Sequence, residues 1–489
     1  MKRIIYIFGL IVFVLTGYSC SDSNSDSTDA TFIEIYDTDT TSLKTYYFTT
    51  AASSKMVAIN SDGDWTAYSN DTSWLTITPH AGYGYSDGKL SYIKMSVEKN
   101  TSSSRNGMVI ITSGSVSDTL IVVQNGVERD EGDTFETGWD FVNNLVMGYN
   151  LGNTLDASQD LAQSSSWFNP KTVYDWETCW GQPVTTQEII DSIAAMGFNA
   201  IRVPVTWFPH MDSEGTVDEA WMDRVEVVVN YVLNAGCYCI LNVQHDSGDK
   251  GTRTDSIGWI VADMDQYDAV SPRFKYLWKQ IAERFRDYGE KLLFEAFNEI
   301  LDENYTWTNP SKSSAYEAVN KLEQDFVDVV RATGGNNEYR NLVCNPYSAG
   351  NSAEKMKGWT APSDIHSNHI LGSVHSYDPY NFCQENKDTT RDYNIYVFDS
   401  SCEEEIDDVI KRVDNRYTEL GVPYFYGEFG AIDEKKKEMS ERVKYATYVA
   451  TAFKEKGTSG LWWMGLFNRS TLTWYEMEIV NALKAVFEQ

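Results

Sequence analysis

The sequence predicts a small all-β sandwich followed by an α/β domain of the (β/α)8 barrel type. Three observations lead to this prediction. Short strand-like segments fill residues 31–127, an acidic stretch without apolar runs follows at 128–138, and eight apolar runs alternate with helical patterns over 139–489. A chain of 489 residues is also long enough for two domains that each bury a sizeable core.

Residues 1–20 have the pattern of an export signal rather than of a folded element. Lys2 and Arg3 give a positive start, and the apolar segment Ile4–Leu15 is too short to span a bilayer comfortably. The segment ends in LTGYSC and resembles a bacterial lipoprotein signal, which implies lipidation of Cys20, and residues 21–30 would form a polar tether. We therefore expect a lipoprotein on the outer membrane of a Gram-negative bacterium, with a secreted or periplasmic protein as the alternative.

The composition favours a neutral ligand. The formal charge is −31, from 71 acidic and 40 basic residues, which argues against nucleic acid or an anionic membrane surface as the partner. The six cysteines after Cys20 show no zinc or disulfide spacing. His366 and His369 could share a helix turn, but no third ligand is obvious, so we interpret them as surface residues, with a structural metal site as the minor alternative. We expect no metal and no other cofactor.

Residues 31–127 contain about seven short strand patterns separated by polar turns, which is typical of an immunoglobulin-like sandwich. The segments GDWTAYSNDTSWLTITP, EKNTSSSRNGMVIIT and IVVQNG resemble the BACON family, whose modules precede polysaccharide-degrading domains in bacterial enzymes. Trp65 and Trp74 could be sugar platforms, but both lie in strand-like sequence, so we expect them in the core. The resemblance leaves open whether the module binds sugar or is a spacer, and we favour the spacer.

Eight apolar runs after residue 138 predict the strands of the barrel. They are Leu145–Asn153, Asn199–Val205, Cys237–His245, Leu292–Glu299, Asn341–Pro346, Ile370–Tyr377, Pro423–Gly430 and Gly460–Phe467. Helical patterns lie between them, for example at 185–197, where Thr185 and Glu188 have capping-box spacing. Continuous apolar strands joined by helices indicate a parallel sheet covered on both faces, and eight such units indicate a closed barrel.

Polar side chains follow these apolar runs at one relative place, where the loops of a barrel form its active site. The candidates are Arg202 on the second strand, Gln244 and His245 on the third, Asn298 and Glu299 on the fourth, His375 and Tyr377 on the sixth, Glu428 on the seventh, and Trp462 and Trp463 on the eighth. The fourth and seventh strands face each other, so Glu299 and Glu428 should oppose one another. Two opposed carboxylates are what the cleavage of a glycosidic bond requires.

The motifs AIRVPV, FNEI, VHSYDPY and YGEFG resemble glycoside hydrolase family 5, a retaining family built on this barrel. MGYNLGNTLDA, the segment from WETCWGQP to AIRVPVTW, and the C-terminal LWWMGLFNRSTLTWYEMEIVNAL resemble its subfamily 4, mostly endo-β-1,4-glucanases and xyloglucanases. The likeness runs from about Gly138 to Glu488. It implies a monomeric retaining endo-β-1,4-glucanase of plant cell-wall β-glucan, with xyloglucan as the favoured substrate.

The resemblance also implies a role for each matched residue. Glu299 would be the general acid and then the general base, and Glu428 the nucleophile. The remaining substrate-site residues would be Arg202 and Tyr377 as hydrogen-bond partners of Glu428, Asn298 at the sugar 2-hydroxyl, His375 near Glu299, Gln244 and His245 at the third strand, and Trp463 stacked on the sugar.

Two features depart from the family pattern. Gln244 stands where subfamily members usually have the first of two histidines, so we expect catalysis to survive with a changed pH profile or substrate contact. WWMGL lacks the polar residues that usually follow this pair of tryptophans, which leaves the match to Trp462 or Trp463 open by one place. Adjacent residues on a strand face opposite ways, so only one of the two can meet the sugar.

Other functions stay open at this point. Within the family, a cellulase or mixed-linkage glucanase, a xylanase or a mannanase would share these motifs. A non-catalytic surface glycan-binding protein would not need the pair of glutamates with their Asn, Arg and Tyr partners. A structural adhesin would leave the strand-end polar residues without a reason.

Overall fold

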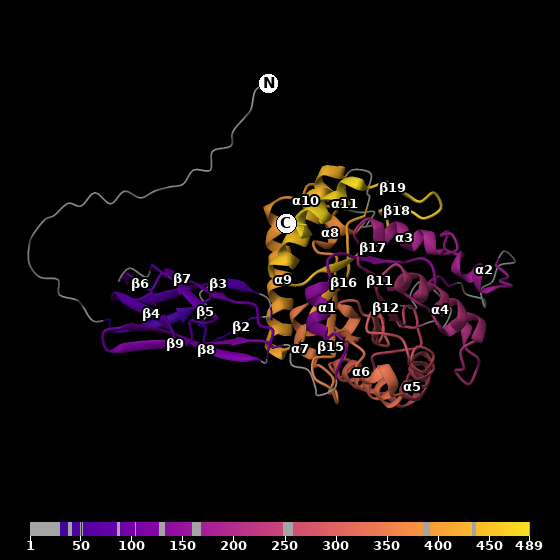
Figure 1. The fold of residues 1–489 in the computed structure, drawn as a ribbon, viewed down its shortest axis with the longest axis horizontal. Helices are drawn as coiled ribbons and strands as arrows, with labels where there is room; N and C mark the ends of the chain where they lie inside the picture. Colours follow the sequence, from indigo (N-terminus) through magenta and orange to yellow (C-terminus); the bar gives the residue numbers. More distant parts are fainter. Residues whose placement is uncertain are drawn as a thin grey trace, which may run out of the picture.

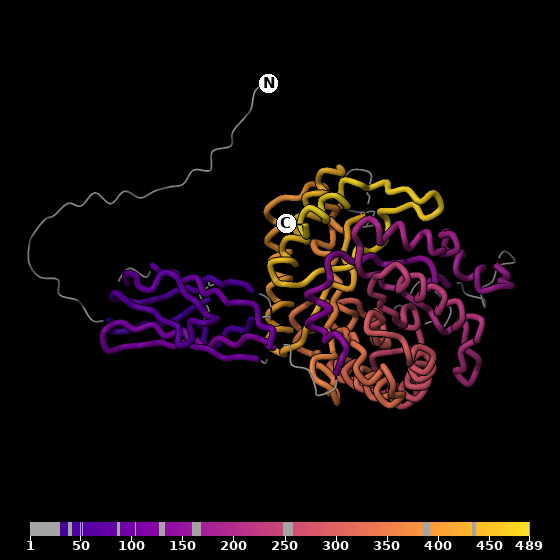
Figure 2. Tube along the Cα trace, in the orientation of Figure 1, coloured from indigo at the N-terminus to yellow at the C-terminus, as the bar shows by residue number. Residues whose placement is uncertain are grey.

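The computed structural model describes residues 30–37, 42–48, 50, 52–85, 89–102, 104–126, 133–158, 168–247, 258–384, 392–432 and 437–488. The predicted signal segment with Cys20 lies outside these residues, as do the tether up to residue 29 and residues 128–132 of the predicted linker. In the part that is described, an all-β body lies beside a larger barrel (Figure 1), and Figure 2 shows the same two bodies as a continuous trace. No helix in that part is long and apolar enough to cross a membrane.

The N-terminal body is a sandwich of two sheets, as predicted. In hydrogen-bonded order, one sheet contains β1 (Ile33–Tyr36), β3 (Ser53–Ser61), β7 (Ser91–Val97) and β5 (Leu75–Thr78). The other contains β2 (Thr45–Phe48), β9 (Val116–Gln124), β8 (Arg105–Ser113), β4 (Trp65–Ser69) and β6 (Ala81–Gly82). Buried and exposed side chains alternate along β4 and β5, because one face of each sheet packs on the other sheet.

The two tryptophans of the sandwich belong to its core, as the sequence predicted. Trp65 is 2% exposed and Trp74 is 4% exposed. Each indole N–H has a partner inside the sandwich, since Trp65 donates to Ser91 (3.1 Å) and Trp74 donates to Asp71 (3.0 Å). Neither ring is placed to stack on a sugar.

The C-terminal body is a closed barrel of eight parallel strands. They are β10 (Gly148–Asn150), β11 (Ala200–Val203), β12 (Tyr238–Asn242), β13 (Leu292–Glu295), β14 (Leu342–Cys344), β15 (Ile370–Ser376), β16 (Tyr424–Phe429) and β17 (Gly460–Trp463). Each lies inside one predicted run, in the predicted order, so the (β/α)8 prediction is confirmed. The runs are longer than the strands because their polar ends already belong to the loops above the barrel.

Helices surround the barrel and close one of its ends. They are α1 (Gly138–Asn144), α2 (Val173–Glu177), α3 (Gln187–Ala195), α4 (Glu219–Asn234), α5 (Tyr267–Arg284), α6 (Ser314–Ala332), α7 (Ala353–Gly358), α8 (Tyr380–Cys383), α9 (Ser400–Leu420), α10 (Met439–Glu455) and α11 (Met477–Phe487). Short strands β18 (Phe467–Asn468) and β19 (Thr473–Trp474) follow the last barrel strand. Phe141 and Val142 of α1 pack with Ala200, Leu293 and Leu461 from the starts of the strands, so α1 seals the N-terminal end of the barrel.

Two local predictions are wrong. Helix α3 is capped by Thr186, whose hydroxyl accepts the N–H of Ile189, whereas the N–H of Thr185 donates to Glu177. His369 is fully buried rather than on the surface, because its ring nitrogens lie 3.0 Å from an Asn341 oxygen and 2.8 Å from an Asp133 oxygen. Buried polar partners of this kind offset the cost of taking the ring out of water.

The sandwich lies beside α9 (Figure 1), and polar side chains join it to the barrel domain. Asn125 donates to the carbonyl of Thr418 on α9 (3.5 Å), and Asn143 of α1 donates to the Thr50 hydroxyl (3.3 Å). These contacts hold the sandwich against the wall of the barrel, away from the carboxyl ends of its strands.

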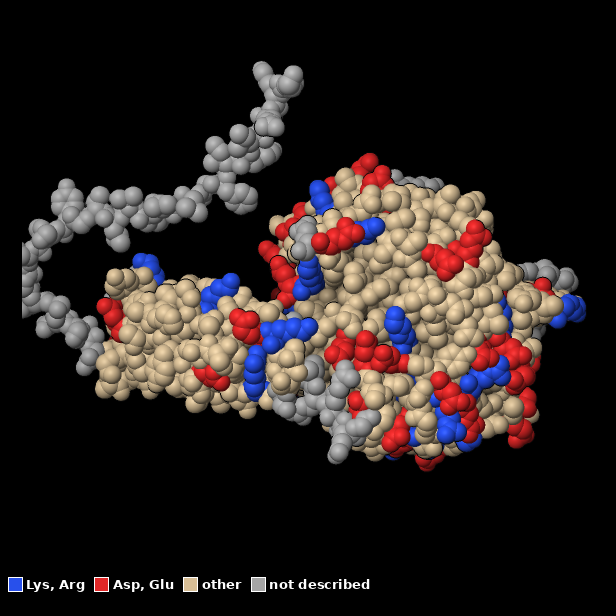
Figure 3. Space-filling model, in the orientation of Figure 1, with Lys and Arg blue, Asp and Glu red and all other residues tan. Residues whose placement is uncertain are grey.

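Acidic and basic side chains are interspersed over the visible face of the barrel, while much of the sandwich in this view is uncharged (Figure 3). One such cluster joins Arg284 of α5 to three acids of α4, namely Glu219, Asp223 and Glu226. Exposed pairs of this kind add little stability. This cluster therefore joins α4 to α5 at the barrel wall.

Closure of the barrel leaves no room for a side chain at Gly148. A Cβ added there would lie 2.1 Å from Cγ of Leu461 in the core that α1 covers. We expect Gly148→Ala to destabilise the barrel by about 1–3 kcal/mol through overpacking. Gly289→Ala is the matched control, because a Cβ at Gly289 meets nothing within 4 Å. Urea unfolding followed by tryptophan fluorescence tests this, and equal midpoints for the two variants would contradict it.

Candidate active site

The strand-end residues meet at the carboxyl end of the barrel, where Glu428 is held by two donors. Arg202 of β11 donates to one oxygen of Glu428 (2.9 Å), and the Tyr377 hydroxyl donates to the other (2.8 Å). Burial, together with the charge of Glu428, raises the pKa of Tyr377 well above its ordinary value, so the phenol keeps the proton that it donates. Both oxygens of Glu428 are thus fixed in direction, and its negative charge is balanced by a guanidinium.

Arg202 is itself completely buried and connects several strands. Its Nε donates to Glu295 of β13 (2.5 Å), and its other nitrogens donate to Asn150 (3.0 Å) and Asn298 (2.9 Å). Burial alone would lower the pKa of Arg202, but the carboxylates of Glu295 and Glu428 raise it above its ordinary value. The guanidinium therefore stays charged in the core, where an unpaired charge would be costly.

Sequence reasoning missed three residues of this network. They are Asn150, Glu295 and Asn345, whose amide donates to Glu295 (3.1 Å). Each is a polar residue within or at the end of an otherwise apolar strand pattern, which is the signal that could have found them. A buried acid inside a strand needs a cationic partner, and Arg202 is the arginine that the barrel places beside it.

Glu299 lies in a different environment from Glu428. Its side chain is 23% exposed, against 7% for Glu428, and Nδ1 of His375 lies 2.7 Å from one of its oxygens. The same nitrogen lies 3.6 Å from Glu428, so the imidazole lies between the two carboxylates. Burial opposes the charge on His375, but Glu428 and Glu299 outweigh it and raise the pKa of His375 above its ordinary value.

The two glutamates are close enough to act on one bond. One oxygen of Glu299, one oxygen of Glu428 and a ring nitrogen of His375 all lie within 4.8 Å of one another. In the part of the chain that is described, these three side chains could also offer ligands to a metal ion. The direct contact between His375 and Glu299 already uses their facing atoms in a hydrogen bond.

The register of β17 decides between the two tryptophans. Trp463 pairs with Asn150, whose amide bonds to Arg202 on the barrel axis, whereas Trp462 pairs with Tyr149 on the outer face of the strand. Trp462 is buried against Phe429 (ring centroids 5.3 Å apart), and Trp463 is only partly buried. Trp463 therefore faces the inside of the barrel. Both tryptophans and Tyr377 border a hollow of about 310 Å³, so the register rather than this hollow separates the two rings.

Gln244 and His245 take different positions. The buried Gln244 accepts a hydrogen bond from Asn242 (2.6 Å), which ties its side chain into the barrel. His245 is partly exposed, with Nε2 3.8 Å from Asp156 and its ring 5.3 Å from that of Trp180. Burial raises the pKa of Asp156 to about 6. Of the two, His245 lies at the rim, where a substrate could reach it.

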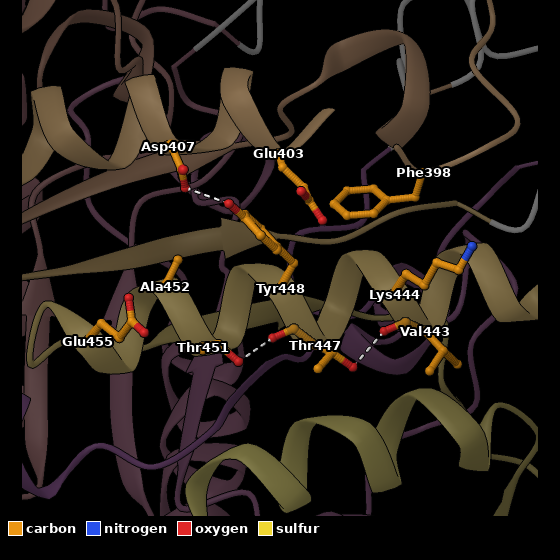
Figure 4. A pocket seen from close by; sticks show the side chains of 10 residues that line it. All are labelled: Phe398, Glu403, Asp407, Val443, Lys444, Thr447, Tyr448, Thr451, Ala452 and Glu455. Atoms are coloured by element: carbon orange, nitrogen blue, oxygen red, sulfur yellow. Dashed lines mark hydrogen bonds between the residues drawn. The ribbon is translucent and has the colours of Figure 1, made fainter. Parts of the chain in front are cut away.

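A second hollow, of about 580 Å³, lies on the outer wall of the barrel between α9 and α10 (Figure 4). Tyr448 crosses it to donate to Asp407 (2.9 Å), and Phe398, Glu403 and Lys444 line it. None of the strand-end residues belongs to this hollow. The site at the carboxyl ends of the strands gathers Arg202, Glu295, Glu428, Tyr377, His375 and Glu299 into one bonded network, and such a cluster of ionisable groups is typical of a catalytic centre.

A closed (β/α)8 barrel with two neighbouring carboxylates in unequal environments at its carboxyl end has the architecture of a glycoside hydrolase. Comparison with protein-family models agrees, since Cellulase (glycosyl hydrolase family 5) matches residues 161–467. The chain belongs to glycosyl hydrolase family 5. The BACON model matches residues 63–125, which confirms the resemblance of the sandwich to that family.

Curated relatives and solved structures support the same assignment. Endoglucanase A of Clostridium longisporum is 33% identical over 80% of this chain and 72% of its own length. A family 5 enzyme from Prevotella bryantii, solved with a xyloglucan tetradecasaccharide, is 38% identical with a TM-score of 0.65, covering 72% of this chain and 99% of that one. A Bacteroides ovatus GH5 xyloglucanase is 25% identical with a TM-score of 0.64, covering 94% of this chain and all of that one.

The subfamily resemblance is also confirmed. A GH5-4 broad specificity endoglucanase from Clostridium longisporum is 32% identical with a TM-score of 0.65, and it covers 73% of this chain and 99% of that one.

The position of His375 between two carboxylates predicts a pH-dependent contribution to stability. Because its pKa in the folded protein is raised above the ordinary 6.5, the charged ring stabilises the fold fully below pH 6.5 and loses this effect as the pH rises through the folded value. We expect His375→Gln to lower the urea midpoint more in mildly acidic than in alkaline buffer. A difference from wild type that grows as the pH rises would contradict this.

Proposed function

We propose that the protein is a retaining endo-β-1,4-glucanase of plant cell-wall glucans and that xyloglucan is its favoured substrate. The observation that carries the proposal is the unequal environment of two adjacent glutamates. Glu428 is bonded to a cation and a phenol, whereas Glu299 is more exposed and bonded to His375. One carboxyl group can then act as an ionised nucleophile while the other delivers a proton.

In the first step, an oxygen of Glu428 attacks the anomeric carbon of the sugar. The bond from that carbon to the glycosidic oxygen breaks, and Glu299 gives its proton to the departing oxygen. Arg202 and Tyr377 keep Glu428 aimed and compensate its charge before the attack. The product of this step is a glycosyl ester of Glu428.

In the second step, Glu299 acts as a base. It takes a proton from a water molecule, whose oxygen attacks the anomeric carbon and releases Glu428 as a carboxylate. Two inversions at the same carbon retain its configuration. The approach of the glutamate oxygens to within 4.8 Å supports this route, because inverting enzymes keep their carboxyl groups roughly 6.5–9.5 Å apart to hold a water between them.

Asn298 and Trp463 would hold the sugar at the cleavage point. The side-chain oxygen of Asn298 accepts from Arg202, which turns the amide N–H group into the donor that can meet the 2-hydroxyl. Such a contact strengthens as positive charge develops on the ring in the transition state. Trp463 offers the face of an indole from the inward side of β17, next to Gly152, where a Cβ would lie 2.8 Å from the ring.

The choice of xyloglucan rests on the related structures. One was solved with a xyloglucan tetradecasaccharide and another is a xyloglucanase with a bound heptasaccharide, and the second aligns with most of this chain, including the sandwich. Broad specificity endoglucanases and a lichenase are also similar. The formal charge of −31 suits a neutral polymer better than an acidic one.

Reducing-end release from xyloglucan, carboxymethylcellulose, barley β-glucan, mannan and xylan tests the proposal. We expect the highest kcat/KM on xyloglucan, and a loss of at least ~100-fold for Glu299→Ala and for Glu428→Ala, since each removes a group that acts in the transition state. Glu283→Ala, an exposed glutamate on α5, is the matched control and should keep wild-type rates.

Three outcomes would contradict the proposal in different ways. A higher kcat/KM on mannan or xylan than on xyloglucan would show that the proposed substrate is wrong. Near-wild-type rates in Glu299→Ala or Glu428→Ala would overturn the catalytic pair. Tight binding of the glucans by wild type without any release of reducing ends would favour a glycan-binding protein.

A further inference from the structure

The loop that follows Glu299, residues 302–313, is organised around one buried carboxylate. Asp302 accepts the backbone N–H groups of Asn304 (3.1 Å), Thr306 (3.0 Å) and Ser311 (2.8 Å). Burial opposes the charge of Asp302, but the hydrogen bonds from Ser311 and Thr306 lower its pKa to about 2. The carboxylate therefore stays ionised over the working range of an enzyme, and its hydrogen bonds join both ends of the loop.

Residues that follow β14 in the chain form hydrogen bonds to the backbone of the same loop. The Tyr347 hydroxyl donates to the carbonyl of Thr306 (2.7 Å) and accepts the N–H of Asp302 (3.0 Å). The buried ammonium of Lys355 donates to the carbonyl of Trp307 (2.8 Å) and to the Ser348 hydroxyl (2.7 Å). The backbone of Trp307 is thus held by a charged side chain that has been taken out of water, which is a costly way to fix a surface loop.

In spite of this anchoring, the Trp307 side chain is open to solvent. It is 48% exposed, more than any other tryptophan in the described ranges. A large ring that an ordered loop leaves uncovered is typical of a contact site, because tryptophan otherwise buries most of its area in the core. Its own loop does not use the ring to close the fold.

The anchors place this loop on the side of the proton donor. Asn351 donates to the carbonyl of His375 (3.2 Å) and to Asp378 (2.7 Å), and His375 bonds to Glu299. Burial lowers the pKa of Lys355 to about 8, and the charges of Glu299 and Asp378 partly oppose this lowering. The segment that carries the anchors therefore lies next to Glu299.

Trp463 lies on the opposite side of the barrel. The closed order of strands puts β17 four places from β13, whose following loop carries Trp307. A general acid lies beside the oxygen that leaves, so the loop next to Glu299 faces the departing half of the chain, and Trp463 faces the half that becomes the ester.

We infer that Trp307 is the stacking platform for the glucosyl unit on the leaving-group side of the cleaved bond, and that Lys355 positions it. This inference rests on the proposed function and adds to it the residue that binds the departing chain. Binding energy from a sugar that does not itself react can be spent on the transition state, so the loss of the platform should lower kcat/KM on a polymer.

The test compares two substrates that differ in their leaving group. On xyloglucan the leaving group is a sugar chain, whereas a chloronitrophenyl glycoside of the xyloglucan heptasaccharide releases a phenol and needs no sugar beyond the cleaved bond. We expect Trp307→Ala to lose roughly 10- to 100-fold in kcat/KM on the polymer. Its rate on the aryl glycoside should stay within about twofold of wild type. Trp307→Phe should restore most of the loss.

Two further variants complete the experiment: Lys355→Met tests the positioning of Trp307, and Tyr92→Ala is the control. Lys355→Met should show the same selective loss on the polymer, because it frees the backbone of Trp307 without removing the ring. Tyr92→Ala, which removes an exposed ring from the sandwich, should leave both rates unchanged.

Equal losses on the two substrates would mean that Trp307 only supports the fold, and an unchanged rate on the polymer would mean that it binds no sugar. Either result overturns the inference while the proposed function stands. A wild-type protein that cleaves neither substrate would overturn the proposed function itself, and the inference with it.

Discussion

The buried guanidinium of Arg202 is the interaction on which the site depends. It joins Glu295 on β13, Glu428 on β16, Asn150 on β10 and Asn298 above β13, so one charge connects strands from opposite sides of the barrel. A cation in the core must be paired, and pairing it with two acids leaves the site with a fixed negative group at one place. The direction of Glu428 and the orientation of the Asn298 amide both follow from it.

The rest of the fold leaves this hydrogen-bond network accessible from one end of the barrel only. Helix α1 closes the amino end of the barrel with Phe141 and Val142, so polar groups on the axis can meet a substrate only at the carboxyl end. There, His375 lies between the two glutamates, and β17 with Trp463 stands opposite β13, the strand that precedes the loop of Trp307. The sandwich contacts the side of the barrel at α9, and the open end stays clear of it.

The sequence predicted the order of the eight strands and the polar residues at their ends, because the hydrophobic pattern of a strand and the residues of a turn are local features of the chain. It was not sufficient for Glu295, Asn150 and Asn345, whose partners come from strands far away in the chain and whose places look like ordinary strand positions. The choice between Trp462 and Trp463 needed the register with β10, and the cap of α3 moved by one residue because Glu177 binds the N–H of Thr185. Such outcomes depend on three-dimensional neighbours, which a pattern along the chain does not contain.

The most direct measurement of the role of Glu428 is mass spectrometry after reaction with a glucan oligosaccharide whose 2-hydroxyl is replaced by fluorine and whose leaving group is activated. Fluorine slows both steps, and a reactive leaving group lets the first step outrun the second, so a nucleophile is trapped as its glycosyl ester. We expect the intact protein to gain the mass of one glycosyl unit, and fragmentation to place it on Glu428, with no gain in Glu428→Ala. An adduct on another residue, or turnover without any adduct, would contradict the assignment of Glu428 as the nucleophile.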